Sequence, residues 1–252
     1  MQILNIAAYR FVALDDPGRW RDAIKARCDA LALKGTILLA PEGINLFLAG
    51  SPNAIEKFIT WLGSDRVFRD HAGADPFANL TVKKSTSAAQ PFRCMRVRTK
   101  REIITMRHPT IRPQGRRAAS LTPEKLATWI AQGHDDAQRE LVLLDTRNAF
   151  EVAIGTFEIA RELGLARFGD FPEAVRRVAD ELRDKTVVTF CTGGIRCEKA
   201  ALLMEELGFE NVFQLEGGIL NYFEKAGDAH WWGDCFVFDE RAALDAQLRE
   251  RS

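Results

Sequence analysis

Residues 186–200 read TVVTFCTGGIRCEKA, and this stretch decides which fold we expect for the second half of the chain. It opens with a short apolar, β-branched run that is typical of a buried parallel strand. A helical pattern follows over residues 197–207, so the stretch indicates a strand, a loop and a helix. In an open α/β sheet, ligands bind beyond the carboxyl ends of the strands, and the loop is therefore a candidate site.

The loop after this strand consists of Cys191, Thr192, Gly193, Gly194, Ile195 and Arg196. We expect it to curl around Cys191, with Gly193 and Gly194 adopting backbone angles that aim several N–H groups at the sulfur. The positive end of the next helix and the permanent charge of Arg196 also favour an anion there. The pKa of Cys191 should therefore be lowered, as suits a catalytic thiolate or persulfide.

The sequence around the loop predicts a doubly wound α/β domain over residues 120–228. Residues 141–145 and 211–215 read as further buried strands, with helical patterns between the strands.

Four side chains beside the loop each allow two interpretations. Asp145 and Arg147 follow one of the strands, and we favour an ion pair that fixes the loop over proton transfer. Cys197 is either a buried structural thiol, which we favour, or a resolving thiol. Glu198 is either solvated or ion-paired, which we favour, or contacts the substrate.

Residues 1–106 alternate strand and helix patterns, which indicates a small α+β domain of ferredoxin-like type. Asp16-Pro17 and Ser51-Pro52 each combine an N-cap residue with proline at the first helical position. They predict helices that run to about residues 33 and 62. Strands are expected at 6–14, 36–39 and 44–48, near 67–82, and at 93–105, with a loop over 85–90.

Charge is unevenly distributed along the chain, although 35 Lys and Arg residues balance 35 Asp and Glu residues. Residues 83–117, called the basic belt below, carry a net charge of +10, while residues 118–252 carry −10. This asymmetry favours contact with the phosphates of a nucleic acid over an ordinary solvated face. The predicted RNA-binding residues are Arg96, Arg98, Lys100 and Arg101.

The remaining segments carry weaker signals. Prolines and charges over residues 107–119 predict a basic linker, and residues 229–252 are expected to form a tail that packs on the domains. An odd cysteine count with irregular spacing fits the reducing cytoplasm. We expect no signal peptide and no membrane span. The scattered histidines and the missing dinucleotide fingerprint predict no metal site and no identifiable cofactor, and no protein partner is indicated.

Three ordered motifs are similar to those of the rhodanese family. They are the loop from Cys191 to Arg196, the segment 145–151 with an Asp-x-Arg and a glutamate four residues later, and the strand and turn at 215–219. The resemblance covers residues 120–228 and implies a rhodanese-like domain in which Cys191 carries the chemistry.

Two further segments, APEGIN at 40–45 and GDCFVFDER at 233–241, make the chain resemble one subfamily, the rhodanese-domain tRNA uridine hydroxylases. The resemblance implies an oxidoreductase that makes 5-hydroxyuridine at the wobble position of tRNA, with dioxygen as co-substrate. A wobble base lies in the single-stranded anticodon loop and can be splayed into a pocket. Longer members carry a cysteine-rich tail after the last motif, and we expect its role to be absent here.

Two other functions remain open. The same loop chemistry suits a sulfurtransferase that carries sulfane sulfur from thiosulfate as a persulfide of Cys191. A non-catalytic rhodanese-like binding module is the third possibility, against which the intact cysteine argues. Phe92, Trp231 and Trp232 are candidates for stacking on RNA bases, with a place in the core as the alternative.

Overall fold

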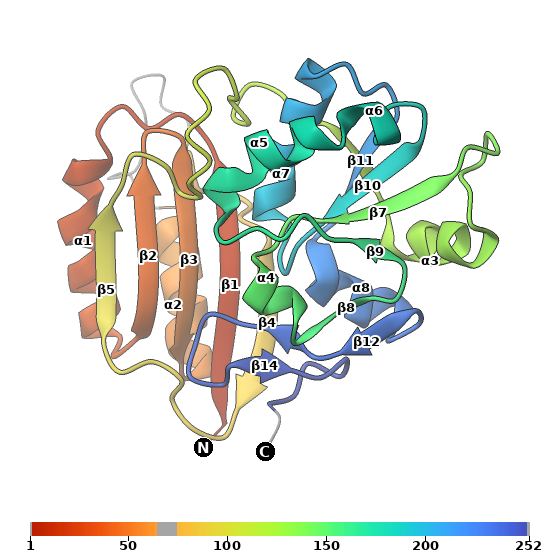
Figure 1. Cartoon of the computed structure of the whole chain (residues 1–252). Helices are drawn as coiled ribbons and strands as arrows, with labels where there is room; N and C mark the ends of the chain where they lie inside the picture. The colour runs from red at the N-terminus through yellow and green to blue at the C-terminus, as the bar shows by residue number, and fades with distance from the viewer. Residues whose placement is uncertain (1, 65–74, 251–252) are drawn as a thin grey trace. The chain divides into compact units, whose positions relative to one another are not determined.

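The computed structural model describes residues 2–64 and 75–250, which form two compact units, 1–104 and 105–252 (Figure 1). The division lies close to residue 106, the predicted end of the N-terminal domain. Most of the strand expected near 67–82, and also His71, lie outside the described residues.

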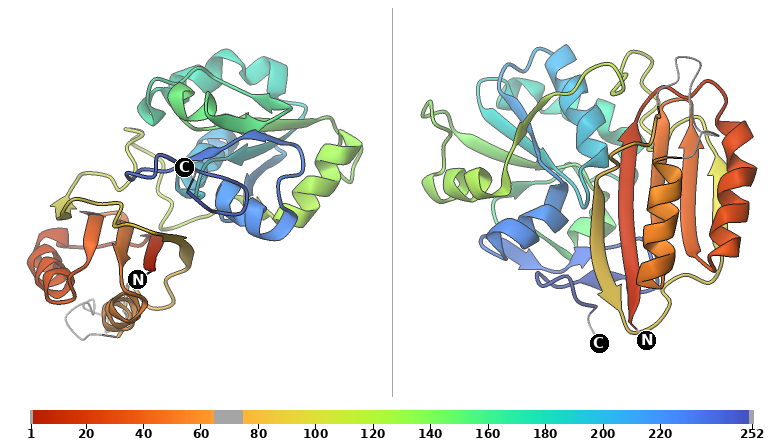
Figure 2. Two further views of the ribbon diagram at one scale, coloured as in Figure 1. Left: turned by 90° about the horizontal axis from the view of Figure 1, so that it is seen from below. Right: turned by 180° about the vertical axis from the view of Figure 1, so that it is seen from behind.

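The first unit is a five-stranded sheet with two helices on one face (Figure 2). Its elements are β1 (Ile3–Phe11), α1 (Pro17–Ala30), β2 (Lys34–Ala40), β3 (Gly43–Gly50), α2 (Pro52–Leu62), β4 (Val82–Ser87) and β5 (Met95–Thr99). The strand order is β4-β1-β3-β2-β5, in which β5 is one of the two edge strands and pairs parallel with β2, while the other pairings are antiparallel. The predicted ferredoxin-like arrangement is confirmed, with β5 added at its edge.

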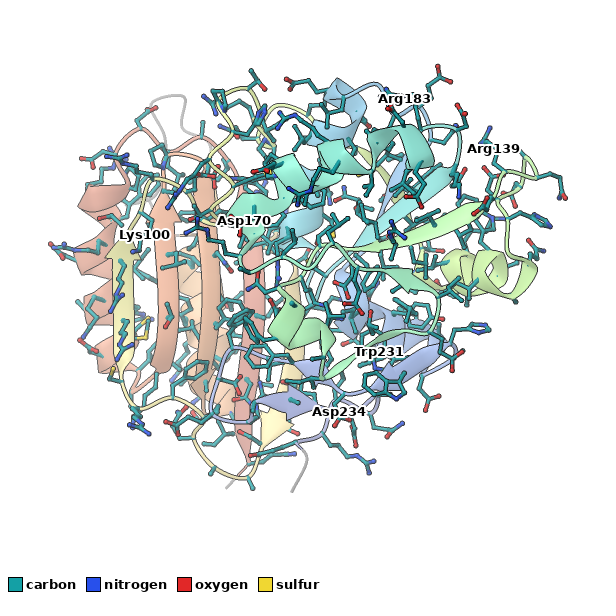
Figure 3. The ribbon with its side chains drawn as sticks, in the orientation of Figure 1. Lys100, Arg139, Asp170, Arg183, Trp231 and Asp234 are labelled. Carbon is teal, nitrogen blue, oxygen red and sulfur yellow. The ribbon has the colours of Figure 1, made fainter. Side chains whose placement is uncertain are left out.

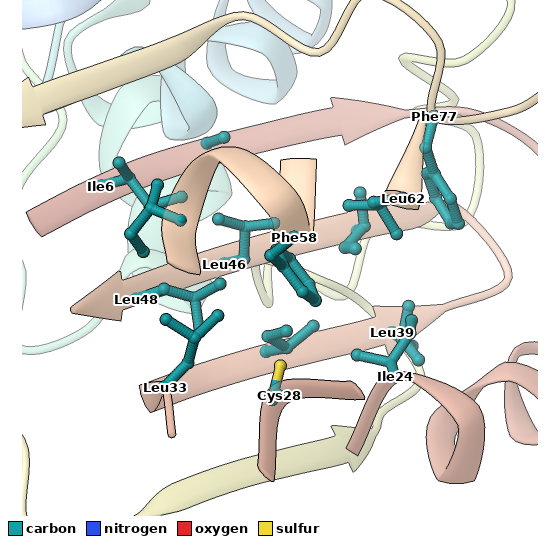
Figure 4. Close-up of a cluster of buried hydrophobic side chains, with 14 of the residues drawn as sticks. Ile6, Ile24, Cys28, Leu33, Leu39, Leu46, Leu48, Phe58, Leu62 and Phe77 are labelled. Carbon is teal, nitrogen blue, oxygen red and sulfur yellow. The ribbon is translucent and has the colours of Figure 1, made fainter. Parts of the chain in front are cut away.

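Both helices of this unit begin at the predicted caps. The Asp16 carboxylate accepts hydrogen bonds from the first backbone amides of α1, and the Ser51 hydroxyl accepts one from the amide of Ala54. Apolar side chains of the helices then meet those of the sheet, as Figure 4 shows for Cys28 of α1 and Phe58 of α2. This core lies between the helices and the sheet.

The loop predicted over residues 85–90 is partly wrong, because residues 85–87 belong to β4. Backbone pairing with β1 continues to Ser87, opposite Ile3. The Asn5 amide donates a hydrogen bond of 3.0 Å to the Ser87 hydroxyl, so small polar residues are accommodated in the ladder. The polar composition of the segment concealed this strand.

The predicted basic strand is β5, and its side chains alternate as expected. Met95 and Val97 pack against the core of the unit. Arg96 and Arg98 point to the opposite side and are exposed. Lys100 follows directly after the strand and is exposed as well (Figure 3).

The second unit is built on a five-stranded, entirely parallel sheet of order β6-β11-β10-β7-β9. Its elements are β6 (Ala119–Leu121), α3 (Pro123–Gln132), β7 (Leu141–Asp145), α4 (Ala149–Val152), β8 (Gly155–Phe157), β9 (Ala160–Arg161), α5 (Phe171–Arg177), α6 (Ala179–Leu182), β10 (Thr186–Phe190), α7 (Ile195–Glu206), β11 (Val212–Leu215), α8 (Gly218–Ala226), β12 (Trp231–Gly233), β13 (Cys235–Phe236) and β14 (Ala243–Leu244). Helices α3 and α8 pack together on one face and α5 and α7 on the other, which confirms the doubly wound fold (Figure 1).

Two segments predicted to flank this domain pack onto it. In residues 107–118, Ile111 is buried and Arg117 pairs with Glu198 of α7 at 2.5 Å, so the basic segment lies along an acidic helix. In the tail, β12 pairs with β8. In the part of the chain that the structure describes, no helix is both long and apolar enough to cross a bilayer.

Candidate active site around Cys191

Cys191 lies at the carboxyl end of the central strand β10, and its thiol is completely buried. Helix α7 begins at Ile195, two residues before the expected start, so Arg196 lies in the first helical turn. The backbone amide of Gly194 donates a hydrogen bond of 3.2 Å to the Cys191 sulfur. The amide of Arg196 donates a second one. The predicted cradle of N–H groups is therefore present.

The pKa of the Cys191 thiol is lowered from 9.0 to about 6. Burial by itself raises this pKa. The hydrogen bond from the Cys197 thiol, the charge of Arg196 and the two backbone amides outweigh burial, because all of them favour the anion. The expected lowering of the pKa is thus found, and the surroundings of Cys191 favour its thiolate over its thiol.

The backbone conformation requires glycine at only one of the two predicted loop positions, Gly193 and Gly194. Gly194 has φ of +95°, a conformation that residues with a Cβ rarely adopt. Gly193 does not have a positive φ, and a Cβ placed there would meet nothing within 4 Å. The expectation that Gly193 needs a special backbone angle is therefore wrong, and Gly194 alone forms the sharp turn.

Helix α8 holds the loop from its other side. The amide of Ile219 donates to the carbonyl of Cys191 at 3.0 Å, and the amide of Leu220 to that of Thr192 at 3.1 Å. A Cβ on Gly218 would lie 2.4 Å from the Cys191 carbonyl oxygen, so only glycine permits this approach. The sequence indicated the motif at 215–219 but not this supporting role.

Arg196 is held by a carboxylate that the predicted site omitted. Its two terminal nitrogens bind the two oxygens of Glu151, each at 2.7 Å, and both side chains are buried. Burial opposes the charge on Arg196, but Glu151 and the Cys191 anion raise its pKa overall. Arg196 is therefore a fixed cation beside Cys191, positioned by α4. The glutamate four residues after Arg147 was the available signal.

Asp145 and Arg147 form the expected ion pair, with a nitrogen–oxygen distance of 2.6 Å and neither side chain exposed. The pair is tied to β8, because Arg147 donates to the carbonyl of Gly155 and Thr156 donates to Asp145. These contacts join the loop after β7 to the rest of the domain. Nothing in them requires proton transfer.

Cys197 and Glu198 point in different directions from the start of α7. The Cys197 thiol is buried and hydrogen bonds to Cys191, and burial together with the Cys191 anion raises its pKa well above 9.0. Cys197 is thus a protonated donor that stabilises the Cys191 anion. The Glu198 carboxylate pairs with Arg117 and accepts a hydrogen bond from Gln214.

Two other sets of predicted residues lie outside this loop. The four basic residues Arg96, Arg98, Lys100 and Arg101 belong to the first unit. Trp231 is packed in the core against Phe157 and Phe223, so the idea that it stacks on a base is wrong, whereas Trp232 is exposed. Phe92 is half-buried. Within residues 2–64 and 75–250, no three His, Cys, Asp or Glu side chains are grouped to hold a metal ion.

Comparison with known proteins agrees with the two-unit architecture. Residues 3–103 match the UPF0176 acylphosphatase like domain, and residues 122–225 match the rhodanese-like domain. The solution structure of a rhodanese-like domain from Anabaena covers 46% of this chain and 80% of that chain, with 20% identity and a TM-score of 0.37.

Curated relatives match over almost the whole chain. A tRNA uridine(34) hydroxylase from Cupriavidus taiwanensis is 58% identical over 98% of this chain and 85% of that protein. A protein of the same name from Bordetella avium is 58% identical over 99% of both chains.

Proposed function

This chain belongs to the tRNA uridine(34) hydroxylase family, and we propose that it hydroxylates C5 of uridine 34 in tRNA with Cys191 as its reactive group. Family membership makes it a tRNA-modifying oxidoreductase. The C5 position follows from the subfamily that the sequence resembles. The role of Cys191 rests on the geometry of its loop.

The observation that carries the proposal is a buried thiol at the carboxyl end of the central strand, with hydrogen-bond donors directed at its sulfur. A thiolate or persulfide is the reactive form of cysteine, and burying an anion is costly unless donors surround it. Gly194, Arg196 and Cys197 supply these donors. The loop therefore supports either anion with donors that are already in place before it reacts.

Each neighbouring side chain has a positioning role in this proposal. Glu151 orients Arg196, and the Asp145–Arg147 pair fixes the loop after β7. Dioxygen is the co-substrate that the resemblance implies, and the described residues supply the anion site at which the uracil ring is presented. The other loop residues, Thr192, Gly193 and Ile195, belong to the same proposed active-site loop.

We further propose that the anticodon loop of tRNA is bound through the basic strand. Arg96 and Arg98 are exposed on β5, and Lys100 and Arg101 extend the row. Exposed cations of this kind contact phosphates without selecting a base, so they would position the tRNA while the Cys191 loop selects the uridine. The five free cysteines fit a protein that works in the cytoplasm, where tRNA is found.

Nucleoside analysis of tRNA tests the function directly. A strain that lacks this protein is complemented with the wild-type chain or with Cys191→Ser, with Cys28→Ser as a control in a buried thiol of the first unit. We expect 5-hydroxyuridine in tRNA only with the wild-type chain and the control, and only when the cells are grown with dioxygen. Full hydroxylation by Cys191→Ser would remove Cys191 from the mechanism.

An assay of thiocyanate formation from thiosulfate and cyanide distinguishes the sulfurtransferase alternative. The loop also suits a persulfide, so some turnover is compatible with the proposal. Turnover without tRNA hydroxylation in the complemented strain would favour the sulfurtransferase instead.

A further inference from the structure

Two phenylalanines remain half exposed on the second unit, Phe150 at 50% and Phe238 at 49%. Phe150 lies on α4, next to Glu151, which orients Arg196. Phe238 follows β13, in the motif GDCFVFDER to which neither the fold nor the proposed chemistry has given a role. The two residues are far apart in sequence, but both lie near Arg196.

A third ring joins them into one cluster. The ring of Phe236 contacts Phe150 at a centroid distance of 5.2 Å and Phe238 at 5.0 Å, in edge-to-face geometry both times. The guanidinium carbon of Arg196 lies 5.8 Å from the centroid of the Phe238 ring. The aromatic cluster, defined as Phe150, Phe236 and Phe238, therefore borders the same cation that stabilises the Cys191 anion.

The segment that carries Phe236 and Phe238 is fixed to the Cys191 loop. The Thr192 hydroxyl donates to the carbonyl of Phe236 at 3.4 Å. Beyond Phe238, Arg241 binds both carboxylate oxygens of Asp239 in a pair that is almost fully buried. A rigid turn thus holds an exposed ring beside a reactive anion, and rigid exposed aromatics are the side chains on which unstacked bases bind.

We propose that the aromatic cluster is the platform on which the splayed-out uracil ring of the substrate stacks next to Cys191. This inference rests on the proposed function, and it assigns the base-binding surface that the function requires. Phe238 is the ring that contacts the base, while Phe236 and Phe150 support it from the side. Arg196 adds positive charge at the edge of the platform, which favours the electron-rich carbonyl oxygens of uracil.

The exposed Trp232 provides the matched comparison. Its side chain is 57% exposed on β12, similar to Phe238, but it is paired in register with Thr156 of β8, in a part of the tail that precedes the aromatic cluster. If exposure alone mattered, Trp232 and Phe238 would contribute equally to binding of the base. Only the proposed platform makes Phe238 the more important of the two.

The test measures binding of two anticodon stem-loop RNAs, one with uridine at position 34 and one with an abasic nucleotide there. The proteins are the full-length wild-type chain, Phe238→Ala, Phe238→Tyr and Trp232→Ala. Wild type should prefer the uridine RNA by about five- to 150-fold, the range expected for stacking of one base on an aromatic ring. Phe238→Ala should lose most of that preference, while Phe238→Tyr and Trp232→Ala should keep it.

Equal loss of affinity for both RNAs in Phe238→Ala would overturn the proposal, since it would indicate an effect on fold or phosphate binding and not on the base. Loss of the preference in Trp232→Ala as well would overturn it too. Hydroxylation is scored separately: a wild-type chain that binds uridine selectively but leaves tRNA unmodified would refute the proposed function and keep the platform. Phe238→Leu, which keeps an apolar side chain, replaces Phe238→Ala if the alanine variant fails to fold, and it should lose the preference too.

Discussion

The strand β5 and the region around the Cys191 loop both contain arginines, but in opposite environments. Arg96 and Arg98 on β5 are exposed, whereas Arg147 and Arg196 are buried and paired with Asp145 and Glu151. A buried, paired arginine is rigid and keeps its charge in one place, and an exposed one is mobile and screened by salt. The comparison teaches that one region is built to position a reaction and the other to attract a polyanion.

The largest effect should come from breaking the buried pair with Glu151→Ala. The change leaves the Arg196 charge buried without its partner, which typically costs about 3–5 kcal/mol. Urea unfolding of the full chain should show this loss, and tRNA hydroxylation should fall with it. Glu151→Gln, which keeps the shape but not the charge, should recover part of the stability.

The exposed pair of Arg161 and Glu181 is the matched control, with side chains 45% and 52% exposed. Glu181→Ala should cost less than about 1 kcal/mol, as expected for surface ion pairs. Equal losses for Glu151→Ala and Glu181→Ala would contradict the distinction between the two environments.

A second effect concerns pH. The pKa of Cys191 is about 6 in the folded chain, below the ordinary value of 9.0. A group whose folded pKa is depressed stabilises the fold fully above its unfolded pKa and loses that contribution as the pH falls toward its folded pKa. The stability difference between wild type and Cys191→Ser should therefore be largest near pH 9 and decline toward pH 6.

The pKa of Cys191 can also be measured directly from the ultraviolet absorbance of its thiolate. We expect a titration midpoint near pH 6 that is absent in Cys191→Ser. Cys28 is an internal reference, because burial raises its pKa to about 12 and it stays protonated throughout. A midpoint near 9 for Cys191 would show that the loop does not stabilise the anion.

The smallest effect should come from the exposed strand. Arg96→Glu together with Arg98→Glu should weaken tRNA binding and reduce its salt dependence, by about one in log–log slope for each phosphate that the variant no longer neutralises. The Cys191 titration should not change. Arg177→Glu, on the exposed side of α5, is the control and should leave the slope as it is. An unchanged slope in the double variant would make β5 an ordinary solvated strand.

The parts of this molecule that the sequence predicted are those where neighbouring residues determine the structure. The caps at Asp16 and Ser51, the buried run of β10 and the turn at Gly194 all depend on residues a few positions apart. The alternation along β5 belongs to the same class. Short-range periodicity and turn chemistry are sufficient for such elements.

The parts that sequence alone missed depend on contacts between distant segments. Glu151 reaches Arg196 across 45 positions, and Phe236 of the tail meets Phe150 only after the tail folds back. Residues 107–119 read as a basic linker because their prolines and charges exclude regular structure, yet this segment packs along α7 through pairs such as Arg117 with Glu198. A local sequence pattern does not predict which distant residues will lie in contact.

The tail from β12 to β14 also determines when, during synthesis of the chain, the site can be completed. Its β12 pairs with β8, its Trp231 packs over Arg147, and its Phe238 borders Arg196, although Cys191 precedes all of these tail residues in the chain. During synthesis the tail residues that make these contacts leave the ribosome after the strands of the parallel sheet. A nascent chain that already contains Cys191 therefore lacks part of the site, and the reactive anion acquires its full surroundings only after translation has passed Phe238.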